Sequence, residues 1–546
     1  EDHRRRGIMS ERFIQLLDCT LRDGSYITGS HFGAGAIRGI ISKMQEAHAD
    51  IIECGWLKNS EHVFGTAYYH VPSDLEQYLT DKKKDIDYCV MIDWDRYDTD
   101  VLPPYDGKSV DAVRVVFPHG RHKEGIEVGR RIREKGYKVY FQAANTLSYS
   151  NEDLHELAAC MNAFKPVAIS VVDTFGAMYF EDVERLAGLL DAFLDPEIRI
   201  GFHAHNNQQL AFANAIHFLN LMKERGRKCV VDASLSGMGR GAGNATTELM
   251  TSYLNRKEHG DFDENAVLDA IDTYMEGFHE NYSWGYSTPY FIAGLYQTHV
   301  NNVAYLLKNH RTTAQDMHGI FASLSEEERR HYDYDLLERK YLENQDRIVD
   351  DAEVLARLKA EAEGKTVLLL APGKTLLTDR EKIELFSGKN RVLRIGVNAI
   401  VPGYEYDYLF FTNRVRWEYA SEAFPEILAE TNKILLSNIK TEGAEDELIV
   451  NFNRVIKRGW AHFDNAVILL LRLLQRIEAK DVAIAGFDGF RNAYNESYAD
   501  ESLPTLNPDG DWDGLNAEIL DMFRDFKVST EGKMKIRFVT ESYFNQ

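Results

Sequence analysis

The sequence predicts an α/β protein in which a (β/α)₈ TIM barrel is followed by a smaller, doubly wound Rossmann-like domain. Between residues 12 and 240, short β-rich runs alternate with longer helical patterns, and a second alternation begins at Lys365. This pattern is typical of repeated β-α-β units around a parallel sheet. Several of the runs end in polar residues, as expected if an active site lies at the carboxyl ends of the barrel strands.

The first alternation contains eight candidate strands, the number that closes a barrel. They are Phe13–Cys19, Asp50–Trp56, Tyr88–Asp93, Ala112–Phe117, Lys138–Ala143, Ala168–Asp173, Arg199–His205 and Val230–Leu235. The whole chain is expected to divide into a tag or disordered stretch at residues 1–11, the barrel at 12–260, post-barrel helices at 261–322, a charged linker at 323–364 and the second domain at 365–546.

The second alternation predicts a smaller parallel sheet. Its expected strands are Val367–Leu370, Val392–Val397, Tyr408–Phe411, Lys433–Leu436 and Asp481–Ala485. Helices near Asp464–Ala479 and Glu518–Phe526 are expected to cover this sheet, as in doubly wound folds.

Composition and charge exclude several classes of protein. The 546-residue chain has a net charge of −23, whereas nucleic-acid binding draws on clustered Lys and Arg, so no nucleic-acid partner is expected. No apolar run reaches the roughly eighteen residues of a membrane-spanning helix, so no membrane partner is expected. The five cysteines form no Cys-x-x-Cys pair and favour a reducing compartment. We therefore expect a soluble, cytoplasmic protein.

Two motifs at predicted strand ends indicate divalent-metal chemistry. Asp18-Cys19-Thr20-Leu21-Arg22-Asp23-Gly24 follows the first strand, and His203-Ala204-His205-Asn206-Asn207 ends the seventh. Residues two apart on a strand share a face, so His203 and His205 can point toward one ion. Either motif alone is more typical of an ion pair or a hydrogen-bonded histidine. Their combination at matching strand ends predicts a metalloenzyme.

These motifs, with Asp173–Met178 and the Gly-rich segment Ser234–Asn244, resemble a known family. It is the metal-dependent TIM-barrel family of HMG-CoA lyase, and the branch is that of 4-hydroxy-2-oxovalerate aldolase, over roughly residues 12–310. The resemblance implies a class II pyruvate aldolase that acts on pyruvate or another 2-oxo acid plus an aldehyde through an enolate. It implies one divalent cation, Mn²⁺ or Mg²⁺, with Zn²⁺ or Co²⁺ as substitutes. The implied metal ligands are Asp23, His203, His205 and Asn244.

The resemblance also implies roles for other side chains. Arg22 would stabilise the developing oxyanion, and Tyr296 would handle protons. Thr174 and Asp173 would contact or orient the substrate, and the strand-end residues Gln142 and Arg114 are further substrate-binding candidates.

The first motif departs from the aldolases at one position. This chain has Tyr26 where those aldolases carry a catalytic histidine. Tyrosine normally titrates near pH ~10 and is a poor general base at neutral pH. Tyr26, His31, His299 and a metal-bound hydroxide are the candidates, and the base is left open.

The second domain carries weaker signals. Gly373 and Lys374 follow its first strand without the spacing of a P-loop, and other polar residues lie near strand or helix ends. The arrangement resembles Rossmann-like domains of polysaccharide-cluster proteins, which implies a nucleotide-sugar or phosphate ligand and a role in surface-glycan or precursor synthesis. The candidate ligand-binding residues are Gly373, Lys374, Asn398, Asn413, Asp464 and Asp488.

Two alternatives remain open. One is an acyl-CoA-dependent Claisen synthase or an HMG-CoA lyase-like enzyme on the same barrel. The other is a non-catalytic barrel scaffold joined to a C-terminal transferase or ligand-binding domain. A homodimer is expected, because barrels of the resembled family often associate through post-barrel helices.

Overall fold

The computed structural model describes residues 12–309, 312–345, 349–441, 447–491, 495–504 and 511–546. The chain divides into two compact units. One runs to Leu307 and includes Thr312–Asp333, and the other contains Tyr334–Gln546. Each unit has its own hydrophobic core. The prediction of a tag or disordered stretch at residues 1–11 lies outside the described residues.

The first unit contains a closed barrel of eight parallel strands, which confirms the predicted fold. β1 pairs with β2 on one side and with β9 on the other, so the sheet closes on itself. The order around the barrel is β1, β2, β4, β5, β6, β7, β8, β9, and the short β3 (Tyr68–Tyr69) lies beside β2. The eight strands are β1 (Ile14–Asp18), β2 (Ile51–Leu57), β4 (Asp87–Asp93), β5 (Ala112–Phe117), β6 (Lys138–Ala143), β7 (Ala168–Asp173), β8 (Arg199–Ala204) and β9 (Cys229–Ala233).

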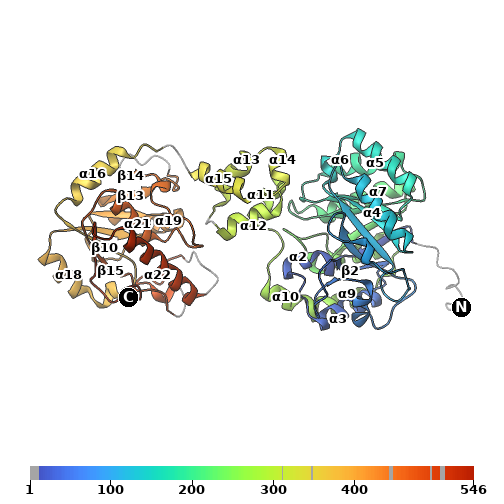
Figure 1. Cartoon of the computed structure of the whole chain (residues 1–546), viewed down its shortest axis with the longest axis horizontal. Coiled ribbons are helices and arrows are strands. Elements are labelled where there is room, and N and C mark those ends of the chain that lie inside the picture. The colour runs from blue at the N-terminus through green and yellow to red at the C-terminus, as the bar shows by residue number, and fades with distance from the viewer. Residues whose placement is uncertain (1–11, 310–311, 346–348, 442–446, 492–494, 505–510) are drawn as a thin grey trace. The chain divides into compact units, whose positions relative to one another are not determined.

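Helices surround the barrel (Figure 1), but two connections lack the expected α-helix. Only 3₁₀ turns follow β2 and β4, at Pro72–Tyr78 and Thr99–Val101. The connection after β2 is divided by β3, and the one after β4 contains Pro103 and Pro104, which lack the backbone N–H of a helix interior. The helices are α3 (Ala34–Glu46), α4 (His122–Glu134), α5 (Asn151–Phe164), α6 (Phe180–Phe193), α7 (Ala211–Glu224), α8 (Thr247–Lys257) and α9 (Glu264–Ala270).

The barrel interior changes from apolar to polar toward the carboxyl ends of its strands. One apolar cluster contains Leu17, Cys19, Ile51, Cys89, Ala112, Tyr140, Ala168 and Val230. Side chains two residues apart share a face of a strand. The next interior layer therefore consists of the residues two positions further along each strand. That layer contains the buried polar residues Glu53, Arg114, Gln142, Ser170 and Asp232. The sequence thus places a polar layer beneath the mouth of the barrel.

Asp18 is a buried structural carboxylate at the end of β1. It accepts hydrogen bonds from the Thr20 amide (3.1 Å) and the Thr247 hydroxyl (2.7 Å), which ties the segment after β1 to α8. Burial raises the pKa of Asp18 to about 6, although these hydrogen bonds partly offset the effect. Asp23 rather than Asp18 therefore remains the ligand candidate in this motif.

The raised pKa makes the stabilising effect of Asp18 dependent on pH. Such a group stabilises the fold fully below its unfolded pKa and loses that contribution as the pH rises through about 6. Wild type should therefore lose about 2 kcal/mol of unfolding free energy relative to Asp18→Asn between pH 4 and pH 7. Urea unfolding at both pH values measures the difference. The exposed variant Asp81→Asn should follow wild type, and parallel pH profiles for Asp18→Asn would contradict the assignment.

Several helices lie in the described parts of residues 261–333, and the predicted linker needs correction. Before the unit boundary lie α10 (Glu276–Asn281), α11 (Thr288–Leu295), α12 (Val300–Asn309), α13 (Ala314–Ala322) and α14 (Glu326–Arg330). The rest of the 323–364 segment contains α15 (Tyr334–Gln345) and α16 (Ala352–Ala362), which belong to the second unit. These helices are amphipathic, because apolar residues at i, i+4 spacing recur among the charges. The buried pairs are Leu337 with Tyr341 and Leu358 with Ala362.

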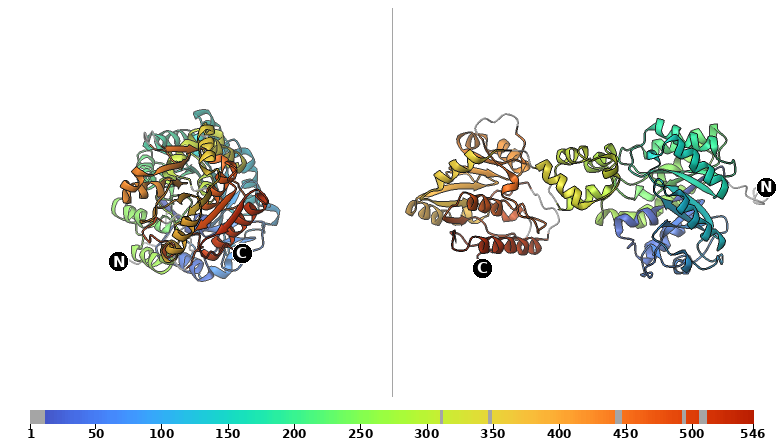
Figure 2. Two further views of the ribbon diagram at one scale, coloured as in Figure 1. Left: turned by 90° about the vertical axis from the view of Figure 1, so that its left-hand side faces the viewer. Right: turned by 45° about the horizontal axis from the view of Figure 1, so that its top comes forward.

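The second unit is a doubly wound sheet of parallel strands (Figure 2). Its order is β14, β13, β12, β11, β10, β15, β16, and every pairing is parallel. The strands are β10 (Thr366–Leu370), β11 (Val392–Val397), β12 (Tyr408–Phe411), β13 (Asn432–Leu436), β14 (Glu447–Val450), β15 (Asp481–Ala485) and β16 (Lys535–Phe538). β14 and β16 were not predicted.

Helices pack against both faces of this sheet. Val367 and Leu369 of β10 join a core with α16, α21 (Ala466–Arg476) and α22 (Trp512–Ser529). Leu368 and Leu370 join a separate core that includes Ile383 of α18 (Arg380–Lys389). Among the residues described here, no helix combines the length and the apolar character needed to cross a membrane.

Candidate functional site

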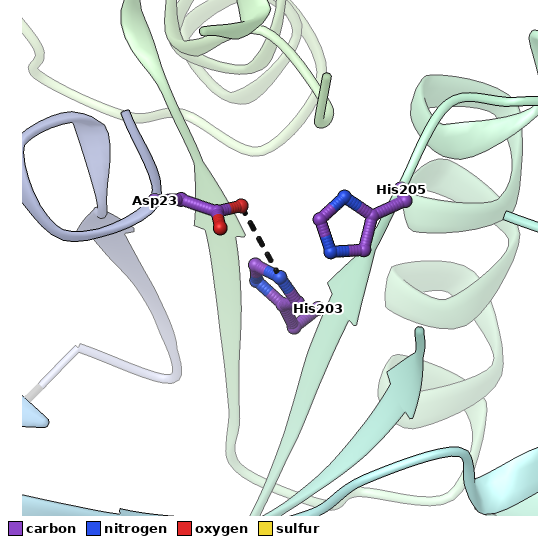
Figure 3. Close-up of side chains that lie close together, drawn as sticks. All are labelled: Asp23, His203 and His205. Atoms are coloured by element: carbon purple, nitrogen blue, oxygen red, sulfur yellow. Dashed lines mark ion pairs between the residues drawn. The ribbon is translucent and has the colours of Figure 1, made fainter. Parts of the chain in front are cut away.

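Three potential metal ligands converge at the mouth of the barrel. Asp23 lies in α1 (Thr20–Asp23) after β1, His203 lies in β8, and His205 follows β8. Figure 3 shows their side chains directed toward one another. One ligand atom from each lies within 4.8 Å of the others, and Nε2 of His203 is 3.7 Å from Oδ2 of Asp23. All three residues are buried. The i, i+2 spacing thus brings both imidazoles to one carboxylate, as the sequence predicted.

Arg22 holds the carboxylate of Asp23 from one side. Its Nη1 donates to Oδ1 of Asp23 and its Nε donates to Oε2 of Glu53, both at 2.9 Å. The indole N–H of Trp56 donates to the Arg22 carbonyl at 3.1 Å. These bonds fix the guanidinium beside the cluster, where Arg22 lines a cavity.

A second buried arginine completes the network. Arg114 donates to Oε2 of Glu53 (2.9 Å) and to Oδ2 of Asp232 (2.5 Å). Asp232 also lies 3.0 Å from Nδ1 of His203, which places the hydrogen on Nδ1 and directs the lone pair of Nε2 toward Asp23. The result is a closed network, here called the six-residue ring, of Asp23, Arg22, Glu53, Arg114, Asp232 and His203.

The ring keeps two of its carboxylates, those of Asp23 and Asp232, ionised. Burial alone would raise the pKa of Asp23, but Arg22 and the two histidines hold it below its usual range. Burial would likewise raise the pKa of Asp232, but Arg114 and His203 lower it. Burial lowers the pKa of His205 to about 4, so this imidazole is neutral near pH 7. An ionised carboxylate and neutral imidazoles are the forms that bind metal.

The surroundings of the cluster fit a divalent ion. In the described part of the chain, two buried atoms beside it have no hydrogen-bond partner: Nδ1 of His205 and Oδ1 of Asn244. The amide nitrogen of Asn244 donates to Oδ2 of Asp23. A Cβ on Gly239 would lie 2.9 Å from Oδ2 of Asp23, so glycine lets this loop approach the cluster. One carboxylate and two imidazoles suit Mn²⁺, Mg²⁺, Zn²⁺ or Co²⁺.

A cavity of about 590 Å³ opens beside the cluster. It lies at the carboxyl ends of the strands, where barrel chemistry is expected. Thr174 lines it after β7, and its hydroxyl oxygen accepts from the Asn145 amide at 2.7 Å. Gln142 also lines it and donates to the Ser170 hydroxyl at 2.7 Å. The predicted site residues that line the cavity are Arg22, Asp23, Tyr26, Gln142, Thr174, His203, His205 and His299.

Two predicted substrate contacts lie away from the cavity surface. Arg114 is 1 % exposed, and its guanidinium forms ion pairs with Glu53 and Asp232. Asp173 accepts hydrogen bonds from the amides of Ala177 and Met178, and burial raises its pKa to about 6. Both act on the site indirectly, Arg114 by holding Asp232 and Asp173 by shaping the turn after β7.

Tyr296 is not at the cavity, which corrects the prediction that it reaches the site. Its hydroxyl lies 3.0 Å from Nε2 of His318 on α13, and it lines a separate small pocket with Arg329. The sequence could not indicate this, because the direction of Tyr296 depends on how α11 packs against α13.

Tyr26 and His299 remain candidates for proton transfer. The guanidinium carbon of Arg240 lies 3.7 Å from the centre of the Tyr26 ring. Desolvation nevertheless raises the pKa of Tyr26, although Arg240 and Arg22 oppose it. Burial lowers the pKa of His299 to about 3. The Asn301 amide donates to its Nδ1 at 3.1 Å, and Nη1 of Arg240 lies 3.5 Å from its Nε2. His31 is exposed and does not line the cavity. The general base therefore stays unassigned.

Several cavity residues were not singled out from the sequence. Asp93 and Arg96 come from the end of β4, and Arg240 comes from the loop after β9. The position of Asp93 at a predicted strand end was a usable signal. Arg330 and Tyr332 also line the cavity. They could not be found, because the sequence around them was interpreted as a linker.

The second unit has a cavity of about 100 Å³ at the carboxyl edge of its sheet. Gly373 after β10, Asn398 after β11 and Asp488 after β15 line it, together with Asp464 before α21. Lys374 instead pairs with Glu501 at 2.9 Å, and the Asn413 side chain caps α19 (Arg414–Ala423). Neither lines the cavity. Four of the six predicted residues therefore surround one space.

Comparisons with known proteins match the barrel. Residues 121–274 match the model of the HMGL-like family. The chain is 30% identical over 277 residues to 4-hydroxy-2-oxovalerate aldolase 2 of Salinispora arenicola, covering 48% of this chain and 75% of that protein. It is 29% identical over 282 residues to 4-hydroxy-2-oxovalerate aldolase of Moorella thermoacetica, covering 49% and 78%.

Among solved structures, the N-terminal domain of a proposed aldolase from Bacteroides vulgatus is 26% identical, with a TM-score of 0.47 over 54% of this chain and 96% of that one. The alignments with these two aldolases cover 75% and 78% of the aldolases' own lengths, at 30% and 29% identity. Because the Salinispora arenicola relative is 30% identical over 75% of its own length, the chain belongs to the HMGL-like family of enzymes.

Proposed function

We propose that the barrel is a divalent-metal-dependent pyruvate aldolase that forms or cleaves a 4-hydroxy-2-oxo acid. The observation that carries the proposal is the convergence of Asp23, His203 and His205 beside Arg22, in one cavity at the barrel mouth. The names of the relatives support the same reaction.

The side chains support a division of tasks. A divalent ion held by Asp23, His203 and His205 would polarise the 2-oxo group of pyruvate and favour loss of a proton from C3. Arg22 would place positive charge beside the oxygen that becomes negative. Thr174 would donate its hydroxyl hydrogen to the substrate carboxylate, because its oxygen already accepts from the Asn145 amide. Asp232 would keep His203 in the tautomer that binds metal.

Exchange of the C3 protons of pyruvate tests the proposal without requiring the aldehyde. In D₂O, the methyl signal of pyruvate should disappear in the presence of protein and Mn²⁺. EDTA should stop this loss of signal, and restoring Mn²⁺ should start it again. Release of pyruvate from 4-hydroxy-2-oxovalerate, followed with lactate dehydrogenase, measures the complete reaction. No exchange with Mn²⁺, Mg²⁺, Co²⁺ or Zn²⁺ would contradict the proposal. Release of free thiol from acetyl-CoA and a 2-oxo acid would instead favour a Claisen synthase.

We also propose that the second unit binds a nucleotide-activated sugar or another phosphate ester. Its cavity lies where the strand order reverses, because β11 follows β10 on one side and β15 lies on the other. Ligands of doubly wound folds bind at such positions. Buried Arg416 also lines the space and offers positive charge. Calorimetric titration with UDP-N-acetylglucosamine and with CMP tests this, and no binding of either at millimolar concentration would contradict it.

Two further expectations stay predictions of the sequence. They are the homodimer and the role in surface-glycan or precursor synthesis. Sedimentation of the purified protein addresses the first.

A further inference from the structure

We propose that the aldehyde partner of the barrel site is polyhydroxylated, an open-chain aldose rather than a short alkyl aldehyde. The inference rests on the proposed aldolase function and specifies its acceptor. Three features carry it: the size of the cavity, the position of its polar lining relative to the metal ligands, and the chemistry of that lining.

The cavity is larger than pyruvate and a two-carbon aldehyde require. Together these molecules have nine non-hydrogen atoms. If each of these atoms is given the roughly 30 Å³ that one water molecule occupies in the liquid, the two molecules fill at most about 270 Å³. The cavity measures about 590 Å³. More than half of it therefore remains for the rest of a longer acceptor.

The remaining space lies across the barrel from the metal ligands. Asp23 follows β1 and the two histidines end β8, with β9 between them in the strand order. β4, β5 and β6 occupy the opposite side of the eight-stranded ring. An acceptor that bonds to C3 of pyruvate beside the metal ligands would therefore extend toward the loops after β4, β5 and β6.

Those loops present hydrogen-bonding groups and an aromatic ring. Asp93, Trp94 and Arg96 line the cavity after β4, His119 lines it after β5, and Asn145 lines it after β6. Carboxylates accept from hydroxyls, guanidinium groups donate to them, and amides do both. An alkyl chain would displace water from these groups and would offer no hydrogen bonds in place of those that they make to water.

The charges in this part of the cavity favour hydroxyls over a phosphate group. Arg96 lies 3.8 Å from the Asp93 carboxylate, and Arg330 lies 3.2 Å from the Glu326 carboxylate. Asp95 and Glu327 also line the cavity. A phosphate would meet these carboxylates as well as the arginines, whereas a hydroxyl can bond to either.

The reaction with an aldose balances without an oxidant or reductant. Pyruvate loses a proton from C3, C3 forms a bond to the aldehyde carbon, and the aldehyde oxygen gains a proton. The product is a 4-hydroxy-2-oxo acid with three more carbons than the acceptor. Cleavage runs through the same changes in reverse.

Matched acceptors of equal carbon number test the inference. With pyruvate and Mn²⁺, kcat/KM is measured for propionaldehyde against D-glyceraldehyde and for butyraldehyde against D-erythrose, each referred to its free aldehyde concentration. Each hydroxyl hydrogen bond adds roughly two- to tenfold, so erythrose should exceed butyraldehyde at least about tenfold. Equal or lower values for the hydroxylated acceptors would overturn the inference. A tenfold preference for glyceraldehyde 3-phosphate over glyceraldehyde would overturn it in favour of an anionic acceptor.

The C3 exchange of pyruvate separates this test from the test of the function. Metal-dependent exchange without any preference for hydroxylated acceptors would sink only the inference. Absence of exchange with all four metals would sink the aldolase function and the inference together.

Variants on the far side of the cavity locate the preference. Trp94→Leu and Arg96→Ala should each lower the ratio of kcat/KM for erythrose over butyraldehyde about fivefold. This ratio does not depend on the fraction of active protein, so partial misfolding would not change it. Arg131→Ala is the matched control, because Arg131 is exposed on α4 and does not line the cavity. If both cavity variants keep the wild-type ratio, the proposed acceptor region is wrong.

Discussion

The Asp23→Asn variant is expected to lose metal-dependent exchange at C3 of pyruvate by about a thousandfold. Asp23 is the only carboxylate in the three-residue cluster that the described chain presents. Asparagine keeps the size of the side chain and can still accept from Arg22, but it removes the negative charge that attracts a dication. The fold should therefore survive while the ion is lost.

Metal content and exchange rate measure this effect together. Wild type dialysed against Mn²⁺ should retain about one ion per chain after gel filtration, as measured by elemental analysis, and Asp23→Asn should retain little. Asp81→Asn is the control, because Asp81 is exposed and, among the described residues, forms an ion pair only with Lys83. If Asp23→Asn kept the metal content and the C3 exchange rate of wild type, the assignment of Asp23 as a ligand would be wrong.

The Arg114→Met variant is expected to lower the unfolding free energy of the barrel by about 3–5 kcal/mol. Methionine fills much of the space, but it removes the cation that bridges two buried carboxylates. Among the described residues, Glu53 then keeps only Arg22 as an ionic partner, and Asp232 keeps only His203. An uncompensated buried charge costs far more than the loss of one surface ion pair. Asp232 would also hold His203 less firmly, so the affinity for Mn²⁺ should fall.

Urea unfolding followed by circular dichroism measures the loss of stability. Arg131→Met on the surface of α4 should change the unfolding free energy by less than about 0.5 kcal/mol. Adding Glu53→Gln to Arg114→Met should recover part of the loss, because it removes one of the two carboxylates that have lost Arg114. A loss below 1 kcal/mol for Arg114→Met would show that the six-residue ring does not stabilise the barrel.

The barrel strands and the clustering of Asp23, His203 and His205 were predictable because both depend on local sequence. The strands follow from β-rich runs of five to seven residues that alternate with longer helical patterns, and His203 and His205 share a face because they are two positions apart. Asp23 could be placed beside them because strand ends of a parallel barrel meet at one rim.

Contacts between distant segments could not be predicted from the sequence. Arg114 and Asp232 are separated by 118 positions, and nothing local distinguishes them from other strand-end polar residues. Tyr296 faces His318 because of helix packing, which the helical pattern of α11 does not encode. The helices at residues 334–362 were missed because charge outweighed the few apolar positions that bury them.

The six-residue ring has a consequence for how such a barrel can diversify. It draws on β2, β5, β8, β9 and the segment after β1, and it takes nothing from β4 or β6. The groups that set the charge at the reacting oxygen are thus locked to one another, and the loops after β4 and β6 are free of that constraint. Insertions or replacements in those loops can exchange one acceptor for another while the chemistry at C3 of pyruvate stays intact.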